Sequence, residues 1–382
     1  MGKPKIRFKG YTEDWEQREL GKIFKEYSEK NHIELPALTI IQGAGTVKRE
    51  DSDRNLMYDE SNLSNYKMVR KDDFIVHLRS FEGGLEKSTL DGIISPAYHT
   101  FHSDEADSRF YYPYFRSYEF IKHKLVPHVY GIRDGRSIDI DGMKTIEIPY
   151  ASIEEQRKIG DYLESLDCLI TLHQRKCEET KKLKKYMLQK MFPQNGQTVP
   201  EIRFAGFTED WEQRKLGECV EFLDTQRKPL EGAKRVSGSY PYYGASGIVD
   251  YVDGYLFDEE LVLLSEDGAN ITDRNYPVCF LAAGKYWVNN HAHVLKILPE
   301  NENNFICNSL ERKDYTQYNT GMAMPKLNKE VCKSIPVECP SYEEQKKIGD
   351  YFRNLDHLIT LHQKKCEELQ KIKKFMLQNM LV

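Results

Sequence analysis

The sequence lacks any apolar run long enough to span a membrane. No stretch of about 18 consecutive apolar residues occurs, and the opening segment Met1–Gly10 is basic and polar. We therefore expect neither a transmembrane helix nor a secretory signal, and a cytoplasmic protein with no membrane partner. Glycine (24) and proline (15) are sparse in the 382 residues, and 40% of residues are hydrophobic. This composition excludes fibrous and disordered chains and suits two or three globular domains.

Cysteine is also scarce, and the chain has no excess of positive charge. No CxxC occurs among the eight cysteines, which argues against both a zinc ribbon and a disulfide scaffold, so we expect free thiols. The 55 basic residues are outnumbered by 60 acidic ones, for a net charge of −5. Since proteins that bind nucleic acid without sequence preference are usually basic, composition alone argues mildly against DNA. The cysteines are Cys168, Cys177, Cys219, Cys279, Cys307, Cys332, Cys339 and Cys366.

Two segments of the chain occur twice. Residues 6–21 (IRFKGYTEDWEQRELG) and 202–217 (IRFAGFTEDWEQRKLG) agree at 13 of 16 positions, and residues 153–192 and 342–381 agree at 27 of 40. The intervening segments show no alignable similarity. The chain is therefore a duplicated unit with similar scaffolds and different inserts.

The repeats define the domain boundaries. Two prolines and an Asn-Gly pair in residues 191–201 mark a helix stop and a linker. The predicted order is a first domain with its short conserved segment (1–152), a central helix (153–192), a linker (193–201), a second domain (202–341) and a C-terminal helix (342–382).

The long repeat is helical by its period. Apolar residues alternate at steps of four and three, as in a heptad seam, and Ser152 with Glu155 and Ser341 with Glu344 form capping-box signatures. Forty helical residues make a rod of about 60 Å. The predicted seam comprises Leu163, Leu166, Ile170, His173 and Cys177 in the first copy and Phe352, Leu355, Ile359, His362 and Cys366 in the second.

Duplicated units usually associate through a two-fold axis, so we expect the two helices to pair antiparallel. Their midpoints would then meet, and His173 would lie close to His362. A polar pin for the helix register is the favoured interpretation of this pair, and a metal site or a pH switch is the alternative.

The two inserts alternate short apolar runs with turns. We predict strands at Phe74–Leu78, Ile93–Ala97, Leu261–Leu264, Val278–Ala282 and His291–Ile297, and a helix at Phe110–Phe120. Each insert is then a mixed α+β domain. The predicted fold class is α+β, with two such domains on two long antiparallel helices and an internal pseudo-two-fold.

Signatures of catalysis are missing. No Walker A loop, GxGxxG, HExxH, nucleophile elbow or zinc-deaminase motif occurs, and the Asn-Pro-Pro-Tyr type motif of DNA amino-methyltransferases is absent too. His291 and His293 could face one side of a strand as metal ligands, but nothing nearby supplies the other ligands. A solvated turn, rather than acid/base catalysis, is the expected role of the carboxylates Asp258, Glu259 and Glu260. We therefore predict no catalytic residues and no metal.

Several motifs together resemble the specificity subunit of type I restriction–modification enzymes. They are IRFxGxTEDWEQRxLG, present twice, and EEQxKIGDYxxxLD at Glu154–Asp167 and Glu343–Asp356. The second insert adds YYGASGI at 242–248, DGAN at 267–270 and GKYWVNNHAHV at 284–294, and the first adds LRSFEGG at 78–84 and ISPAY at 94–98.

The resemblance implies a non-catalytic subunit that binds double-stranded DNA. Each insert would read one half of a bipartite, asymmetric target, and the helices would set the spacing of the two halves. Modification subunits would dock on the helices and methylate adenine with S-adenosylmethionine. A restriction subunit would add translocation and cleavage with ATP and Mg²⁺. This chain would bind none of these cofactors, and the partners would neutralise much of the phosphate charge.

Side chains suited to base edges are Arg, Lys, Asn, Gln and Ser. For each of them a solvated charge or an amide satisfied within its own turn is the competing interpretation, above all for Asn289 and Asn290. The candidate DNA-binding residues are Lys48, Arg49, Arg79, Ser80, Lys87 and Arg133 in the first insert, and Gln226, Arg227, Lys228, Ser246, Asn270, Asn289 and Asn290 in the second.

Two alternatives stay open. The chain could be a coiled-coil assembly protein whose inserts bind other proteins, or a nuclease or methyltransferase with an unrecognised site. Clustered Arg, Lys and Asn in the inserts disfavour the first, and the lack of a phosphate- or cofactor-binding glycine loop disfavours the second. We further expect charge reversal of Lys181, Lys182, Lys184 and Lys185 to weaken partner docking more than sequence choice.

Overall fold

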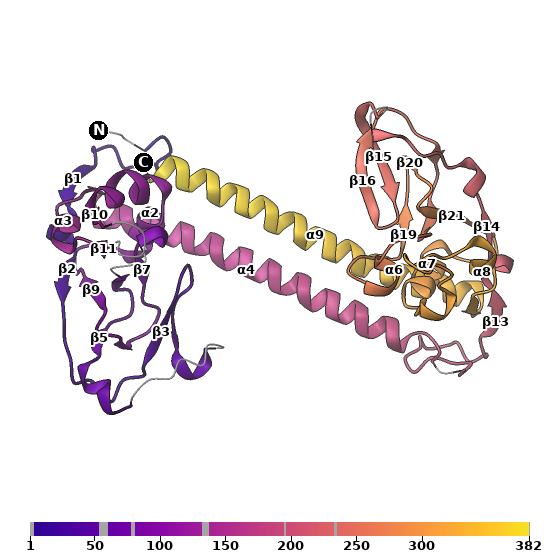
Figure 1. The fold of residues 1–382 in the computed structure, drawn as a ribbon, viewed down its shortest axis with the longest axis horizontal. Helices are drawn as coiled ribbons and strands as arrows, with labels where there is room; N and C mark the ends of the chain where they lie inside the picture. Colours follow the sequence, from indigo (N-terminus) through magenta and orange to yellow (C-terminus); the bar gives the residue numbers. More distant parts are fainter. Residues whose placement is uncertain are drawn as a thin grey trace. The chain divides into compact units, whose positions relative to one another are not determined.

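The computed structural model describes residues 4–52, 60–77, 81–131, 137–194, 196–232 and 235–381. The chain divides into two compact units (Figure 1). The first unit contains residues 1–172 and 365–382, and the second contains residues 173–364. Each unit combines one insert, one short repeat and a stretch of both long helices, and each mixes helices with small sheets. The predicted α+β class is confirmed.

The long repeats form helices α4 (Ile153–Lys190) and α9 (Tyr342–Met380). In the first unit the beginning of α4 packs on the end of α9, where Leu166 and Ile170 are buried against Leu369. In the second unit the end of α4 packs on the beginning of α9, where Lys184 Nζ donates to both carboxylate oxygens of Asp356 at 2.6 and 2.8 Å. Both contacts require antiparallel helices, as the duplication predicts.

The predicted apolar seam does not run uniformly along the helices. Leu163 belongs to the core of the first insert, and Phe352 and Leu355 belong to the core of the second. Between these ends Cys177 is buried, with its Sγ 4.0 Å from the Ile359 carbonyl oxygen, and Cys366 is partly buried beside Leu166 and Ile170. The helices therefore serve both as partners of each other and as walls of the two domain cores.

The helix starts differ from the predicted capping boxes. Ser152 Oγ accepts from the Glu155 backbone N–H at 3.3 Å, and Ser341 Oγ accepts from that of Glu344 at 3.4 Å. The return bonds of the box are not made, because Arg7 and Arg203 of the short repeats bind the two buried carboxylates instead. The box prediction is correct for the serines and wrong for the glutamates.

In the first unit the main sheet has the strand order β2-β9-β6-β7, and β1 pairs with β12 in a separate two-stranded sheet. Strand β6 confirms the prediction at residue 74, whereas β8 ends at Ile94, before the predicted Ala97. The elements are β1 (Glu16–Glu19), α1 (Leu20–Ile23), β2 (Lys25–Tyr27), β3 (Leu38–Ile41), β4 (Gly45–Lys48), β5 (Lys67–Val69), β6 (Phe74–His77), β7 (Glu86–Lys87), β8 (Gly92–Ile94), β9 (Tyr98–His102), α2 (Ser108–Phe115), β10 (Val129–Tyr130), β11 (Ser137–Ile138), α3 (Ile140–Lys144) and β12 (Glu147–Tyr150).

The helix predicted at Phe110–Phe120 is two helices. Helix α2 ends at Phe115, and a π-helical segment follows at Glu119–Leu125. The break lies at Ser117, whose Oγ accepts from the Phe120 backbone N–H at 3.1 Å and so competes with a continuous helix. Phe115 and Phe120 still share one core, with ring centroids 4.9 Å apart.

In the second unit two four-stranded sheets have the orders β14-β21-β18-β19 and β16-β15-β20-β17. The strands predicted from residues 261, 278 and 291 correspond to β18, β19 and β21, with ends shifted by one residue. The elements are β13 (Glu212–Lys215), α5 (Leu216–Cys219), β14 (Val220–Phe222), β15 (Ser237–Gly244), β16 (Gly247–Val252), β17 (Phe257–Asp258), β18 (Leu261–Ser265), α6 (Asn270–Asp273), β19 (Cys279–Ala282), β20 (Lys285–Val288), β21 (Ala292–Ile297), α7 (Asn303–Glu311), α8 (Lys329–Lys333) and β22 (Pro336–Cys339).

All eight cysteines are free thiols. Within the described ranges, no helix has both the length and the apolar character needed to cross a membrane.

Candidate nucleic-acid interface

A glutamine near the start of each long helix helps to anchor one insert. Gln156 Oε1 accepts from the Asp107 backbone N–H at 3.0 Å, just before α2. Gln345 Oε1 accepts from the Glu302 backbone N–H at 3.1 Å, just before α7. The repeated helix sequence therefore holds two different inserts by the same bond, and the loops that differ between the inserts are positioned on a common support.

In the first insert, two of the three described candidates end neighbouring strands, and Arg49 begins the short turn after one of them. Lys48 ends β4 and Lys87 ends β7, and the two strands are joined where Thr46 Oγ1 accepts from the Thr89 backbone N–H at 3.0 Å. Lys48 is 45% exposed and lies 3.5 Å from Glu50, so it can still reach a ligand. Lys87 is 18% exposed and donates to Asp72 at 2.8 Å. The Arg49 guanidinium lies 5.4 Å from the centre of the Tyr66 ring.

Three predicted residues of this insert, Arg79, Ser80 and Arg133, lie outside the described residues.

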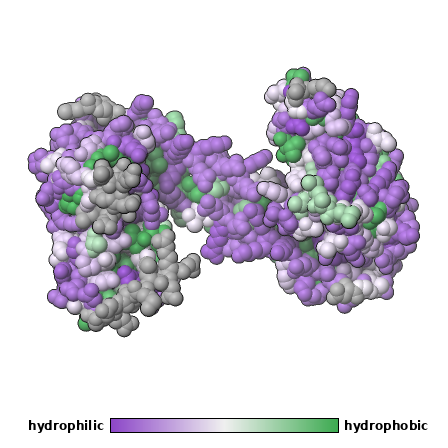
Figure 2. Space-filling view, in the orientation of Figure 1, coloured by the Kyte–Doolittle hydropathy of each residue, from purple (hydrophilic) through white to green (hydrophobic). Residues whose placement is uncertain are grey.

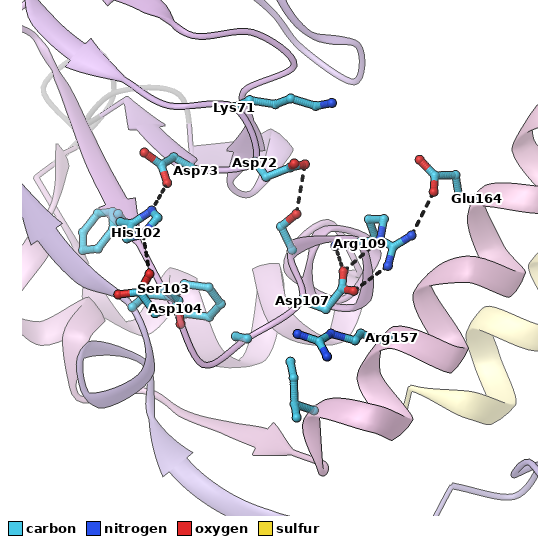
Figure 3. A pocket seen from close by; sticks show the side chains of 15 residues that line it. Lys71, Asp72, Asp73, His102, Ser103, Asp104, Asp107, Arg109, Arg157 and Glu164 are labelled. Carbon is cyan, nitrogen blue, oxygen red and sulfur yellow. Dashed lines mark hydrogen bonds and ion pairs between the residues drawn. The ribbon is translucent and has the colours of Figure 1, made fainter.

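A cleft of about 470 Å³ in the first unit is lined mainly by charged side chains (Figure 3). Asp73 is buried, and its Oδ1 lies 2.5 Å from His102 Nδ1. Burial lowers the pKa of the His102 imidazole, but its hydrogen bonds to acidic neighbours outweigh burial and the pKa is raised. Arg109 donates to Asp107 at 2.7 Å and to Glu164 at 3.0 Å. These charges pair with one another and brace α2 against α4.

In the second insert, several turns converge on the segment Glu266–Gly268. The Glu266 backbone N–H donates to the His291 carbonyl at 2.9 Å, and the Leu327 N–H donates to the Glu266 carbonyl at 2.7 Å. Ser265 Oγ donates to the carbonyl of Ala245, in the turn between β15 and β16. Three turns distant in sequence therefore border one short segment, and this is the candidate interface of the second insert.

Two candidates of this insert are already bound within the protein. Arg227 is 12% exposed, forms an ion pair with Glu266 at 2.6 Å and donates to the Ala292 carbonyl at 2.7 Å. Asn270 donates to the Tyr276 carbonyl at 3.0 Å and accepts from the Tyr276 N–H at 2.7 Å. Both side chains hold turns together, so their polar groups are bonded within the folded insert.

The adjacent residues Asn289 and Asn290 have different environments. Asn289 is 7% exposed, and its Oδ1 accepts from the His291 backbone N–H at 2.8 Å. This is an Asx turn, in which the side chain satisfies the backbone two residues on. Asn290 is exposed. The sequence could not separate the two, because either asparagine suits a turn and only the fold determines which one faces inward.

His291 and His293 do not form a metal site. His293 is buried, with Nδ1 2.8 Å from Asp224 Oδ2 and Nε2 2.7 Å from the Leu327 carbonyl oxygen. His291 lies before β21, is half exposed, and its Nδ1 is 2.8 Å from Asp267 Oδ1. In the part of the chain that the structure describes, no group of three or more His, Cys, Asp or Glu side chains has the arrangement to hold a metal ion.

The exposed candidates of the second insert are Gln226, Lys228, Ser246 and Asn290. The carbonyl of Lys228 accepts from Trp287 Nε1 at 2.6 Å, which fixes the lysine backbone and leaves its ammonium exposed. Sequence reasoning missed two further features of this surface, the half-exposed Lys326 and the exposed methionines of the loop before it. The Asn-Thr-Gly run at residues 319–321 was a turn signal that could have directed attention there.

Comparison with known proteins finds similarity over parts of the chain. Residues 208–371 match the family described as type I restriction modification DNA specificity domain. A putative type I restriction enzyme specificity subunit of Haemophilus influenzae is 35% identical over 154 residues, which cover 40% of this chain and 39% of that protein. The MjaVIII specificity subunit of Methanocaldococcus jannaschii is 24% identical over 278 residues, 62% of this chain and 61% of that protein.

In these alignments the chain covers less than two thirds of either curated relative. Similarity in fold to a solved structure covers more of the chain than these sequence alignments do. The crystal structure of a type I restriction–modification S subunit from M. genitalium superposes with a TM-score of 0.67 at 17% identity, over 99% of both chains. Residues 208–371 are therefore similar to the type I restriction modification DNA specificity domain, and the fold of the chain is similar to that of this S subunit.

Proposed function

We propose that this chain is the DNA sequence-specificity subunit of a type I restriction–modification complex. Each insert reads one half of a bipartite, asymmetric DNA target. The observation that carries the proposal is that two inserts of different sequence are held by the same Gln-to-backbone bond on repeated helices. Identical scaffolds presenting different loops suit the reading of two different sequences by one protein.

The repeated helices are the proposed docking sites for modification subunits. Leu169 and Leu172 on α4 are each 42% exposed, and their counterparts in the repeat, Leu358 and Leu361 on α9, are 42% and 49% exposed. The exposed leucines recur at equivalent positions of both helices, as expected if the repeated helices offer the same contact twice. We propose that one modification subunit binds the leucines of each unit.

The proposed division of labour leaves this chain without catalytic residues. Adenine methylation with S-adenosylmethionine belongs to the modification subunits, and ATP- and Mg²⁺-dependent translocation and cleavage belong to restriction subunits. The complex would act in the cytoplasm, where the chromosome is accessible.

Helix length would set the distance between the half-sites. Removing one heptad from each long helix shortens it by about 10 Å, or roughly three base pairs of B-DNA. The spacer of the recognised sequence should shrink accordingly, with both half-sites unchanged.

Methylome sequencing tests the proposal. The chain is expressed with a cognate modification subunit in cells that lack other DNA methyltransferases. A new bipartite motif with methylated adenine in both halves and different half-sites is the expected result. A perfectly palindromic motif would contradict two different readers. A stable complex without any new motif would favour the alternative, an assembly protein whose inserts bind other proteins.

A further inference from the structure

The segment Asn319–Lys326 of the second insert is a closed, tightly held loop. Asn319 Oδ1 accepts from the Gly321 and Lys326 backbone N–H groups at 2.9 and 2.8 Å, and the Thr320 N–H donates to the Lys326 carbonyl at 2.8 Å. A Cβ at Gly321 would lie 1.8 Å from the Met324 carbonyl oxygen, so only glycine fits there. The loop therefore presents its tip in one defined conformation.

The tip of this loop carries two exposed methionines. Met322 is 105% exposed and Met324 is 60% exposed. The visible surface of the second unit is mostly hydrophilic (Figure 2), and methionine is among the side chains most often buried in proteins. A rigid loop that holds adjacent apolar side chains out in solvent suits a contact surface.

The base of the loop joins the candidate interface. The Gly268 backbone N–H donates to the Pro325 carbonyl at 3.0 Å, and Asp267 forms a bridge with Lys326. The same Asp267 binds His291, the residue after Asn290. The methionine tip is thus attached to the segment that the predicted DNA-reading turns border. The 45% exposed Lys326 lies beside it, with its Nζ 3.4 Å from Glu266 Oε1.

We propose that Met322, supported by Met324, is an apolar wedge that inserts at a base step within the half-site read by the second insert. The inference rests on the proposed function. Apolar side chains such as methionine unstack base steps when they are presented beside groups that hold the DNA backbone. The alternative occupant of the tip is a modification subunit, but the backbone bonds of the loop lead to the DNA-reading turns and not to the long helices.

The test uses the full chain assembled with its modification subunits and a duplex carrying the methylated target. The fluorescent base 2-aminopurine replaces one adenine of the second half-site at a time, and its emission rises when a neighbouring base is unstacked. We expect one bright position with the native chain and with Met322→Leu, which keeps the wedge apolar. The double variant Met322→Ala/Met324→Ala should lose this signal and bind about tenfold more weakly.

Leu298→Ala is the matched control, because Leu298 is an exposed apolar residue (37%) at the other end of β21 from His291. It should behave as the native chain. Specific binding with no bright position would overturn the wedge and leave the proposed function intact. Failure of the double variant to assemble with modification subunits would assign the tip to a protein contact and overturn the wedge as well. A native complex that selects no duplex would refute both proposals.

Discussion

His173 Nδ1 lies 3.0 Å from His362 Nδ1, and the two imidazole rings are 5.2 Å apart at an angle of 46°. The residues occupy equivalent positions of the two repeats, and antiparallel pairing brings them together as the sequence predicts. One of the two nitrogens must donate and the other accept. The resulting hydrogen bond joins α4 to α9 within the second unit and fixes the register of the two helices there.

Replacing one histidine of this pair should destabilise the second unit modestly. We expect His173→Ala and His362→Ala to show a coupling energy of about 0.5–1.5 kcal/mol in a double-mutant cycle, measured by urea unfolding. The double substitution of both histidines by leucine should restore or raise the unfolding free energy, because it makes the seam apolar at some expense of register. Strictly additive single variants would show that the contact contributes nothing.

The two repeats offer a matched pair of tryptophans. Trp15 Nε1 donates to the buried Glu155 carboxylate at 3.0 Å, whereas Trp211 Nε1 has no hydrogen-bond partner among the described residues. Trp15→Phe should therefore lower the free energy of unfolding by about 1–2 kcal/mol more than Trp211→Phe. Chemical denaturation of both variants checks this, and equal losses would mean that the Trp15 bond adds no net stability.

Substitution of Asn289 should affect stability, whereas substitution of the adjacent Asn290 should affect DNA reading. Asn289→Ala removes the bond to the His291 N–H and should cost about 1 kcal/mol of stability. Asn290→Ala should leave the melting temperature unchanged and relax the base preference of one position in one half-site by about 1–3 kcal/mol. Differential scanning fluorimetry and methylome sequencing of each variant provide the two readouts. A normal motif from Asn290→Ala would remove it from the set of base readers.

The lysines near the end of α4 have different environments, so we do not treat all of them as one docking patch. Lys184 is 22% exposed and paired with Asp356, so its reversal to glutamate would loosen the helix pair itself. Lys182 and Lys185 are exposed. Reversing these two should weaken assembly with modification subunits while the free chain stays folded. Size-exclusion chromatography measures assembly, circular dichroism serves as the control, and a complex of unchanged stability would argue against docking at these lysines.

The His102 and Asp73 contact should make stability depend on pH. The pKa of His102 is raised above 6.5 in the folded protein, so its stabilising contribution is full below about pH 6.5 and is lost as pH rises through the folded value. The unfolding free energy of the native chain should therefore fall in that window more than that of His102→Gln. Denaturation curves at several pH values test the difference, and parallel curves would contradict it.

The sequence by itself determined the duplication, the two long helices, their antiparallel pairing and the meeting of His173 with His362. These features follow from local period and from equivalence between repeats, and both can be read without knowing the rest of the fold. The α+β character of the inserts was also predictable, because short β-branched runs between turns have few other solutions.

Only the tertiary structure decided which polar side chains remain available to a ligand. Arg227 and Asn270 bond within their own domain, Asn289 turns inward while Asn290 stays exposed, and Glu155 binds Arg7, 148 residues away, instead of its own helix start. Met322 stands out only once its exposure is known. Such choices depend on ion pairs and hydrogen bonds between segments distant in sequence, so neither local pattern nor residue type can reveal them.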